Sequence, residues 1–421
     1  MKRHILEEFV KYFLEKNGGI LVMNKEKALK NQGLEFREDI DFSGGGQQRS
    51  KTLDMIKGMG IVLMVLRHAR APYSDFVLLF HMAIFFIASG YLYNCDYARS
   101  IKGMQKYIRK KIRTLYIPYI LYTSIFIIFN NIFLKLNIYT DNVKFLEEKI
   151  SQGYATLGTK YDLITIIKNI LYAAVFRGGT QLTGASWFFQ TLFMVLILYT
   201  IVEFFLCKLL QKDCVIKIQT FFAGFSLILG WICQIKGWYF FIGLNRVFTV
   251  YSLIHLGVLI KRYSIMEKIL SRVKQEILFS GSLFILLCGY HRGYISLDGN
   301  NIENPIFFLV MSIAGWLMLY SIAIVAEKSD LKINEMLCYI SRHSVPIIML
   351  HFLAFKIVNY IIVCKEQMPS YMIAAFPVLK TTGLWWALYT LFGLIVPLLA
   401  RQIGKRISLS KKFYLICKKN R

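Results

Sequence analysis

One lysine and two histidines lie inside the apolar runs of the chain between Asp54 and Tyr91. They are Lys57, His68 and His81, and a Ser-Gly-Tyr triplet closes the stretch. An ionisable group in the centre of a bilayer costs about 2.5 kcal/mol or more, so such residues usually have a function. Histidine has an ordinary pKa near neutrality and can take a proton from a hydroxyl group. The stretch therefore predicts proton-transfer chemistry at membrane depth.

A helix over 55–71 would place the first two of these side chains on one face. Lys57 and His68 are eleven residues apart, which in an α-helix is about 20° in direction and about 16 Å in height. Asp54 lies on the same face, one turn before Lys57. An ammonium group at the cytosolic end of this helix face and an imidazole deeper along it suit a long anionic substrate that enters from the cytosol. After a short turn at 72–75, the next span brings His81 to a similar depth. Both histidines are candidate catalytic residues, although His81 could instead orient the site, and a hydrogen bond to a neighbouring helix is the alternative for each.

The composition indicates an all-α, polytopic membrane protein. The 421 residues are 56% hydrophobic, with a mean hydropathy of +0.48. Repeated apolar runs of near-bilayer length are not typical of soluble domains. A further run, 163–176, has the spacing of an amphipathic helix at the surface. We expect about ten spans, at 55–71, 76–94, 114–134, 186–206, 218–235, 239–260, 276–290, 305–326, 339–363 and 384–400.

The formal net charge of +26 arises from 51 basic and 25 acidic residues. The connections on one side of the expected membrane carry 25 Lys and Arg, and those on the other side carry 10. This bias follows the positive-inside rule. It argues against nucleic-acid binding and predicts a multi-pass protein of the plasma membrane with both termini in the cytosol.

Three segments follow from these patterns. Residues 1–50 are expected to be a partly disordered cytosolic extension, 51–403 the membrane domain and 404–421 a basic cytosolic tail. No cleavable signal peptide is expected, and Met23 is an alternative start. The eight cysteines lack metal or C-x-x-C spacing, and the intramembrane histidines are spread over four spans. We therefore expect neither a disulfide framework nor a bound metal.

The motif Asp54-x-x-Lys57, ten residues, His68 and then FHMAIFFIASGYL resembles the start of the acyltransferase-3 family of integral membrane acyltransferases. The likeness continues through YIRKKIRTLYIPYIL, SWFF, LNRVFTVYSLIHLGVLIKR and SRHSVPIIMLHF, and covers roughly residues 50–400. Members of this family move an acyl group, commonly acetyl from acetyl-CoA, onto a hydroxyl of a cell-surface glycan. The resemblance implies that His68 is the catalytic histidine and that Lys57 contacts the donor, at a position where the family more often has arginine. No permanently bound cofactor is implied. The partners would be acyl-CoA, a glycan acceptor and the bilayer.

The basic segment before the third span is a second candidate donor site. Arg109, Lys110, Lys111 and Arg113 could hold the phosphates of coenzyme A, or could anchor the chain to anionic lipids. Arg113 is the expected donor contact because it lies nearest the apolar span, with Arg109 beside it.

Five further residues are candidates for the cavity or the acceptor site. Arg246 could face a cavity or pair with an acceptor, and His351 lies near the middle of its span. Trp187 could stack on a sugar or belong to an aromatic belt. Ser89 is more typical of close helix packing than of a nucleophile, and Tyr91 of the membrane interface. His255 lies about 180° from Arg246 around their helix and is expected to be structural.

The leading hypothesis is thus an O-acyltransferase with His68 as general base and direct transfer. An acyl-histidine intermediate is a less favoured variant. The alternative is an exporter or flippase of a lipid-linked or polymeric glycan, and a membrane scaffold or sensor is the third class. The outer loop 135–185 is expected to shape acceptor choice.

Overall fold

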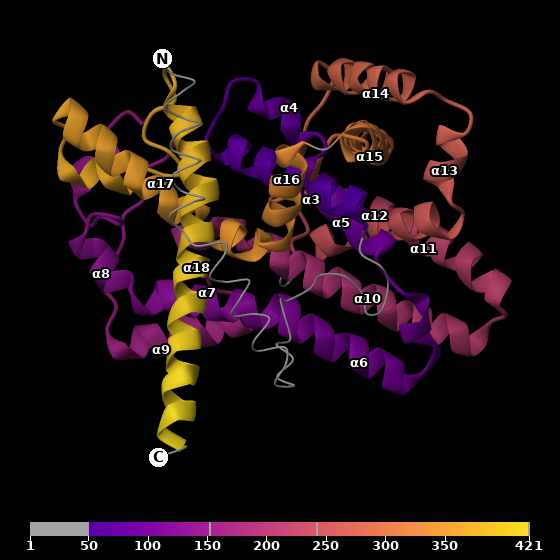
Figure 1. Cartoon of the computed structure of the whole chain (residues 1–421), viewed down its shortest axis with the longest axis horizontal. Helices are drawn as coiled ribbons and strands as arrows, with labels where there is room; N and C mark the ends of the chain where they lie inside the picture. Colours follow the sequence, from indigo (N-terminus) through magenta and orange to yellow (C-terminus); the bar gives the residue numbers. More distant parts are fainter. Residues whose placement is uncertain (1–49, 151–152, 241–242, 330, 420–421) are drawn as a thin grey trace. The chain divides into compact units, whose positions relative to one another are not determined.

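The computed structural model describes residues 50–150, 153–240, 243–329 and 331–419 (Figure 1). The predicted N-terminal extension lies outside the described residues except for its last residue, Ser50. The all-α prediction is confirmed for the described part of the chain, in which the named strands are two-residue segments paired antiparallel.

The first half of the described chain contains the candidate chemistry in its opening helices. Its elements are α3 (Lys51–His68), α4 (Ser74–Leu78), α5 (His81–Tyr91), η1 (Cys95–Arg99), α6 (Ile101–Lys111), η2 (Ile112–Tyr116), α7 (Ile117–Ile128), α8 (Asn130–Lys135), η3 (Val143–Glu147), α9 (Leu163–Ala174) and η4 (Gln181–Ser186).

The second half contains most of the long apolar helices. Its elements are α10 (Trp187–Leu209), α11 (Lys212–Ile235), α12 (Leu244–Arg262), α13 (Ile265–Leu270), α14 (Gln275–Tyr290), β1 (Ile295–Ser296), β2 (Asn301–Ile302), α15 (Pro305–Glu327), α16 (Lys332–Arg342), α17 (Ser344–Glu366), η6 (Ser370–Ala374) and α18 (Trp385–Lys419).

Six segments of the described chain are long and apolar enough to cross a membrane. Helices α3 and α12 have 18 and 19 residues but carry charged side chains at both ends. The chain is therefore a multi-pass membrane protein, while the count of about ten spans stays a prediction. The six are Ser74–Tyr91, Gln181–Leu209, Cys214–Ile235, Pro305–Glu327, Ser344–Glu366 and Trp385–Arg406.

Several expected spans begin or end elsewhere in the structure. The span expected at 76–94 is divided between α4 and α5, and that at 114–134 is interrupted at Phe129. Within the span expected at 239–260, helix α12 begins at Leu244, directly after Gly243, whose φ is +68°. These corrections share one cause: hydropathy reports the preference of a segment for lipid, whereas helix ends depend on local backbone geometry.

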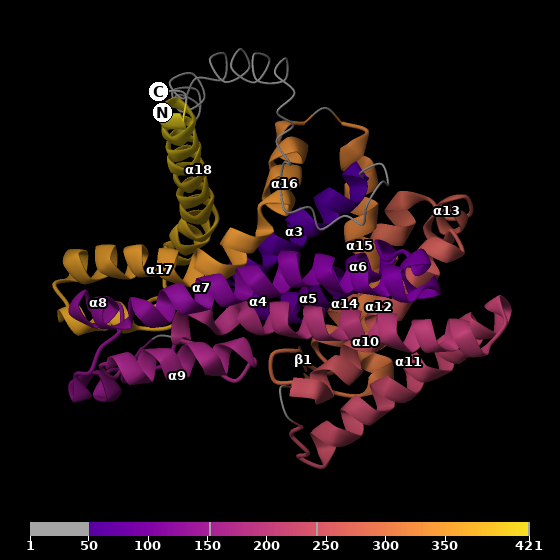
Figure 2. The same cartoon turned by 90° about the horizontal axis from the view of Figure 1, so that it is seen from below.

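The remaining correction concerns the C-terminal third. The span expected at 339–363 is two helices, α16 and α17, separated at His343. Pro346 lies in the first turn of α17, where a missing N–H is tolerated, and it could not continue a helix from α16. Helix α18 continues beyond the last candidate span, which ends at Arg406, to Lys419, and the tail expected at 404–421 stays a prediction. Figures 1 and 2 show α18 crossing α17 at a steep angle.

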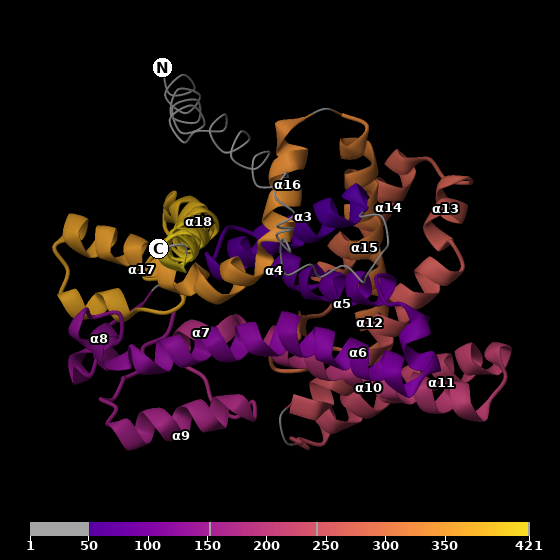
Figure 3. The same ribbon diagram turned by 60° about the horizontal axis from the view of Figure 1, so that its bottom comes forward.

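Helices α6 and α7 run as one rod beside α10 (Figure 3). Between them, η2 is a π-helical turn in which the N–H of Ile117 donates to the carbonyl of Ile112, five residues back. Pro118 has no N–H to donate, so it cannot make the bond to Thr114 that a regular helix requires. Short π-helical segments are frequent at functional sites.

Glycines let the central helices approach closely. A Cβ on Gly257 of α12 would lie 2.0 Å from the carbonyl oxygen of Ile87, and one on Gly90 of α5 would lie 2.0 Å from that of Ile254. A Cβ on Gly58 of α3 would similarly lie 2.2 Å from the carbonyl oxygen of Leu337 in α16. These contacts fix α3 and α5 within the core and thereby position the candidate residues that they carry.

Candidate active site

His68 is the last residue of α3 and lies against α17. Its ring centroid is 5.1 Å from that of His351 and 4.8 Å from that of Phe352. His68 is partly exposed, whereas His351 is completely buried. Residues 283 positions apart in the sequence therefore form one pair of imidazoles, of which only the first is accessible.

The hydrogen bonds of His351 fix which of its nitrogens is available. Nδ1 lies 3.0 Å from the carbonyl oxygen of Ile347. A carbonyl can only accept, so Nδ1 carries the proton and Nε2 of the neutral ring presents a lone pair. Nε2 is buried and has no hydrogen-bond partner among the described residues. Such an atom is suited to receive a hydrogen bond from a group that enters the site.

His81 begins α5 and is also buried. Its Nδ1 lies 2.8 Å from the carbonyl oxygen of Val77, so the same argument leaves Nε2 as an acceptor. His81 is close enough to His68 for the charges of the two rings to interact. Three histidines thus surround the end of α3.

At the opposite end of α3, Lys57 forms an ion pair with Asp54, with Nζ 3.1 Å from the carboxylate oxygen. The Asp54 side chain is 4% exposed and also accepts a hydrogen bond from Ser341 Oγ at 3.3 Å. The Lys57 side chain is 16% exposed and lies at the edge of this pair. A phosphate at this end would meet an ammonium group that is already held in place by a carboxylate.

The basic segment contributes a residue that the sequence analysis did not single out. Lys111 is half-buried, and its Nζ lies 5.0 Å from the ring centroid of Tyr107. Burial, followed by repulsion from Lys110 and Lys57, lowers the pKa of Lys111 to about 7. Lys57 and Lys111 therefore face a common region, although they come from different helices. The signal in the sequence was the basic cluster, but not which of its members points inward.

Arg109 and Arg113, the expected donor contacts, are both exposed. Arg113 lies in the π-helical turn η2, so its direction differs from that in a regular helix. The structure brings Lys111 within electrostatic reach of Lys57.

Beyond His68, side chains from four segments meet. Arg246 of α12 lies over the ring of Trp187, with its guanidinium carbon 5.0 Å from the centroid, and Nη1 donates to the backbone carbonyl of Asp298. Arg67 of α3 pairs with Asp75 of α4 at 3.0 Å. Arg67 was missed in the sequence analysis, although an arginine next to the histidine, near the end of a span, is itself a signal.

Two other candidates lie in helix contacts. Ser89 Oγ donates to the carbonyl of Phe85 at 2.7 Å, within its own helix. The ring of Tyr91 lies 6.5 Å from that of Trp316. Ser89 and Tyr91 flank the glycine through which α5 approaches α12.

His255 has a partner on each ring nitrogen. Nδ1 lies 3.0 Å from the hydroxyl of Tyr199, and Nε2 lies 2.8 Å from Oγ1 of Thr220. This buried ring links three helices, α10, α11 and α12.

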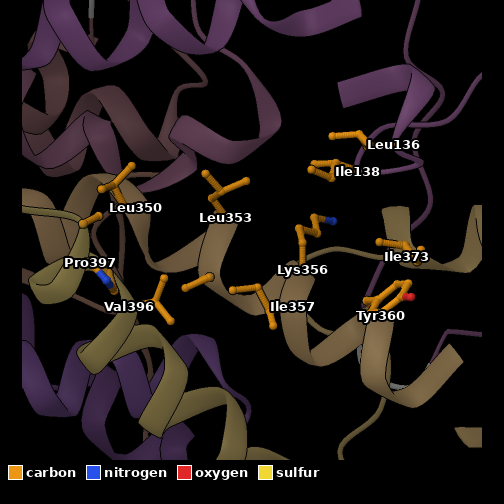
Figure 4. A pocket seen from close by; sticks show the side chains of 12 residues that line it. Leu136, Ile138, Leu350, Leu353, Lys356, Ile357, Tyr360, Ile373, Val396 and Pro397 are labelled. Carbon is orange, nitrogen blue, oxygen red and sulfur yellow. The ribbon is translucent and has the colours of Figure 1, made fainter. Parts of the chain in front are cut away.

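An apolar hollow of about 350 Å³ lies between α17, α18 and the segment after α8 (Figure 4). Leu350, Leu353 and Val396 are among its lining residues, and neither His68 nor Lys57 is. Lys356 extends along this hollow and donates to the carbonyls of residues 374 and 375. In the described part of the chain, no group of three or more His, Cys, Asp or Glu side chains has the geometry of a metal site, and the seven cysteines from Cys95 to Cys364 are free thiols.

In comparisons with known proteins, one family model matches residues 50–402. It is that of the acyltransferase-3 family, described as an acyltransferase domain. No curated protein matches the chain, and no solved structure matches it.

Proposed function

This chain belongs to the acyltransferase-3 family of membrane acyltransferases, and from that premise we propose that it transfers an acyl group from acyl-CoA to a hydroxyl of a glycan. The donor is acetyl-CoA, and the acceptor is a cell-surface glycan or exopolysaccharide at the plasma membrane. The observation that carries the proposal is the pairing of a partly exposed His68 with a buried His351.

His68 is the general base in this reaction. It takes the proton of the acceptor hydroxyl as the hydroxyl oxygen forms an ester bond with the acyl carbon. The carbon–sulfur bond of the thioester then breaks, and the departing thiolate takes up the proton from His68. The transfer is direct, so no bond forms between the acyl group and the enzyme.

The other histidines position the reacting groups. The lone pair on Nε2 of His351 accepts a hydrogen bond, either from the incoming hydroxyl or from His68. His81, whose Nδ1 is bonded to the carbonyl of Val77, presents Nε2 as a second acceptor within electrostatic reach of His68. Their burial among apolar side chains keeps bulk water away from the hydroxyl as it is deprotonated.

The donor enters at the Lys57 end of α3. Lys57 and Lys111 contact the phosphates of coenzyme A as point charges, and the exposed Arg109 and Arg113 attract the donor from solution. The length of α3 is the physical reason for two separate sites. Lys57 and His68 are about 16 Å apart along the axis of α3, so the extended pantetheine arm of the donor can span the distance between them.

The test is acyl transfer by the purified protein in lipid nanodiscs. Radiolabelled acetyl-CoA and a surface-glycan fraction should yield labelled glycan, and His68→Ala should abolish the label. His291→Ala is the matched control, because His291 is an exposed histidine outside the site. Full transfer by a folded His68→Ala variant would refute the mechanism.

A further inference from the structure

Three arginines gather at the His68 end of α3. Arg67 is in the last turn of α3, and Arg70 follows two residues after the helix ends, in a left-handed backbone conformation with φ +56°. Arg246 comes from the first turn of α12. Asp298 links them, because it is close enough to interact electrostatically with Arg67 and because Arg246 donates to its backbone carbonyl. Arg70 and Arg67 are likewise within electrostatic reach of each other and of His68.

The carboxylates nearby do not saturate these guanidinium groups. Asp75 pairs with Arg67, but its side chain is 66% exposed, whereas that of Arg67 is 15% exposed. Asp298 is exposed, and its carboxylate accepts a hydrogen bond from Ser296. In the described part of the chain, neither Arg70 nor Arg246 has a carboxylate at ion-pair distance.

The arginines also hold unsatisfied donors. The Nε atoms of Arg67, Arg70 and Arg246 are all buried, and none has a hydrogen-bond partner among the described residues. A buried N–H of a charged group that lacks an acceptor is costly, so a cluster of three points to an acceptor that comes from outside the chain. The ring of Trp187 holds Arg246 in place by a cation–π contact, which supplies no acceptor for the Nε–H group.

We propose that this arginine cluster binds an oxyanion of the acceptor, a carboxylate or a phosphate, next to the hydroxyl group that is acylated. The acceptor is therefore an anionic saccharide. Guanidinium groups favour such anions because their planar N–H fork matches two oxygen atoms at once. Arg67 and Arg70 flank His68 in the chain, so an anion held by them brings a neighbouring hydroxyl to the imidazole. This inference rests on the proposed function only where it names the ligand as the acceptor. The anion site itself is inferred from the three arginines.

The first experiment measures binding without catalysis. Purified protein in nanodiscs is titrated with galacturonic acid, galactose 6-phosphate and neutral galactose, and its thermal unfolding is followed. We expect the anionic sugars to raise the melting temperature and galactose not to do so. The anionic sugar that raises the melting temperature more shows whether the site prefers a carboxylate or a phosphate.

Variants then assign the site. Arg70→Gln keeps a polar side chain but removes the guanidinium and its charge, and should weaken binding of the anionic sugar about tenfold, as expected for one charged hydrogen bond. Arg246→Gln serves as a second variant if Arg70→Gln does not fold. Arg292→Gln is the control, because Arg292 is an exposed arginine of the α14–β1 connection. Equal binding of galactose and the anionic sugars, no binding of either anion, or anion binding that survives both site variants would overturn the proposal.

Acetyl transfer to the same three sugars separates this inference from the proposed function. Preferential labelling of an anionic sugar, reduced by Arg70→Gln through a higher KM, supports both. If anion binding depends on Arg70 but the wild-type protein labels neither these sugars nor the surface-glycan fraction, the proposed function fails and the anion site stands.

Discussion

At the scale of single residues, the two imidazoles at the end of α3 differ in access and therefore in role. His68 can reach a substrate because it is partly exposed, whereas His351 is enclosed and offers only the lone pair of Nε2. The completely buried ring is suited to orientation, and the accessible ring to proton transfer.

Replacing His351 by phenylalanine tests this division of roles. The substitution keeps an aromatic ring in the contact with Phe352 but removes the acceptor nitrogen. We expect kcat to fall about 10²-fold, the lower range for a positioned proton-transfer group, with the KM for acetyl-CoA unchanged because the donor phosphates bind at the other end of α3. Steady-state kinetics at several donor concentrations give both values. An unchanged kcat would show that the lone pair has no part in the reaction.

Lys111 predicts how donor binding depends on pH. Its pKa is lowered to about 7, so the ammonium form predominates below that pH and the neutral amine above it. A phosphate prefers the charged form, so the affinity for coenzyme A should fall as pH rises from 6 to 8, by at most about tenfold. Isothermal titration calorimetry at both pH values measures the change.

Lys111→Arg is the control for this pH dependence, because a guanidinium stays charged throughout the range. It should keep the tight binding at pH 8, while Lys111→Met should bind weakly at both pH values. A wild-type affinity that does not change between pH 6 and pH 8 would remove Lys111 from the donor site.

At the scale of elements, close approach of backbones decides whether α5 and α12 can pack. Gly257→Ala would push a Cβ to 2.0 Å from the carbonyl oxygen of Ile87, so the helices must separate. We expect a loss of about 1–3 kcal/mol in the free energy of unfolding, as for an overpacked core. Gly224→Ala in α11 is the matched control, because its Cβ would meet nothing within 4 Å. The melting temperature, measured by thermal unfolding in detergent, should be lower for the Gly257 variant and unchanged for the Gly224 variant.

At this scale, some features of the site could be predicted from the sequence and others could not. The common face of Lys57 and His68 could be predicted because the helical period fixes it once 51–68 is a helix. The break at His343 is signalled by the polar residues 341–344 and by Pro346, but the hydropathy of the expected span 339–363 averages over them, so the break was not predicted. The contact of His68 with His351 is tertiary, and no local pattern encodes which face of α17 meets α3. The same limit applies to Lys111, which is distinguished from its basic neighbours only by packing against Tyr107.

At the scale of the whole molecule, the predicted membrane sides agree with the contacts of α3. Its first residues meet α16, which begins within the expected inner connection 327–338, and Lys57 lies within electrostatic reach of Lys111 in the inner connection 95–113. Its last residues meet Asp75 in the expected outer turn 72–75, and the outer connection 291–304 approaches through Asp298. The segments expected inside the cell thus lie at the Lys57 end of α3, and those expected outside lie at the His68 end.

This convergence predicts the outcome of a topology experiment with single introduced cysteines. A cysteine-free background is labelled in intact cells with a membrane-impermeant maleimide, and again after the cells are opened. Gly299→Cys, in the outer connection with open space around it, should react in intact cells. Arg109→Cys, on the exposed face of α6, should react only after opening. The reverse pattern would place the arginine cluster in the cytosol and the Lys57 end outside. Acyl-CoA is made in the cytosol and a surface glycan is met outside, so that reversal would put each proposed substrate at the wrong end of α3.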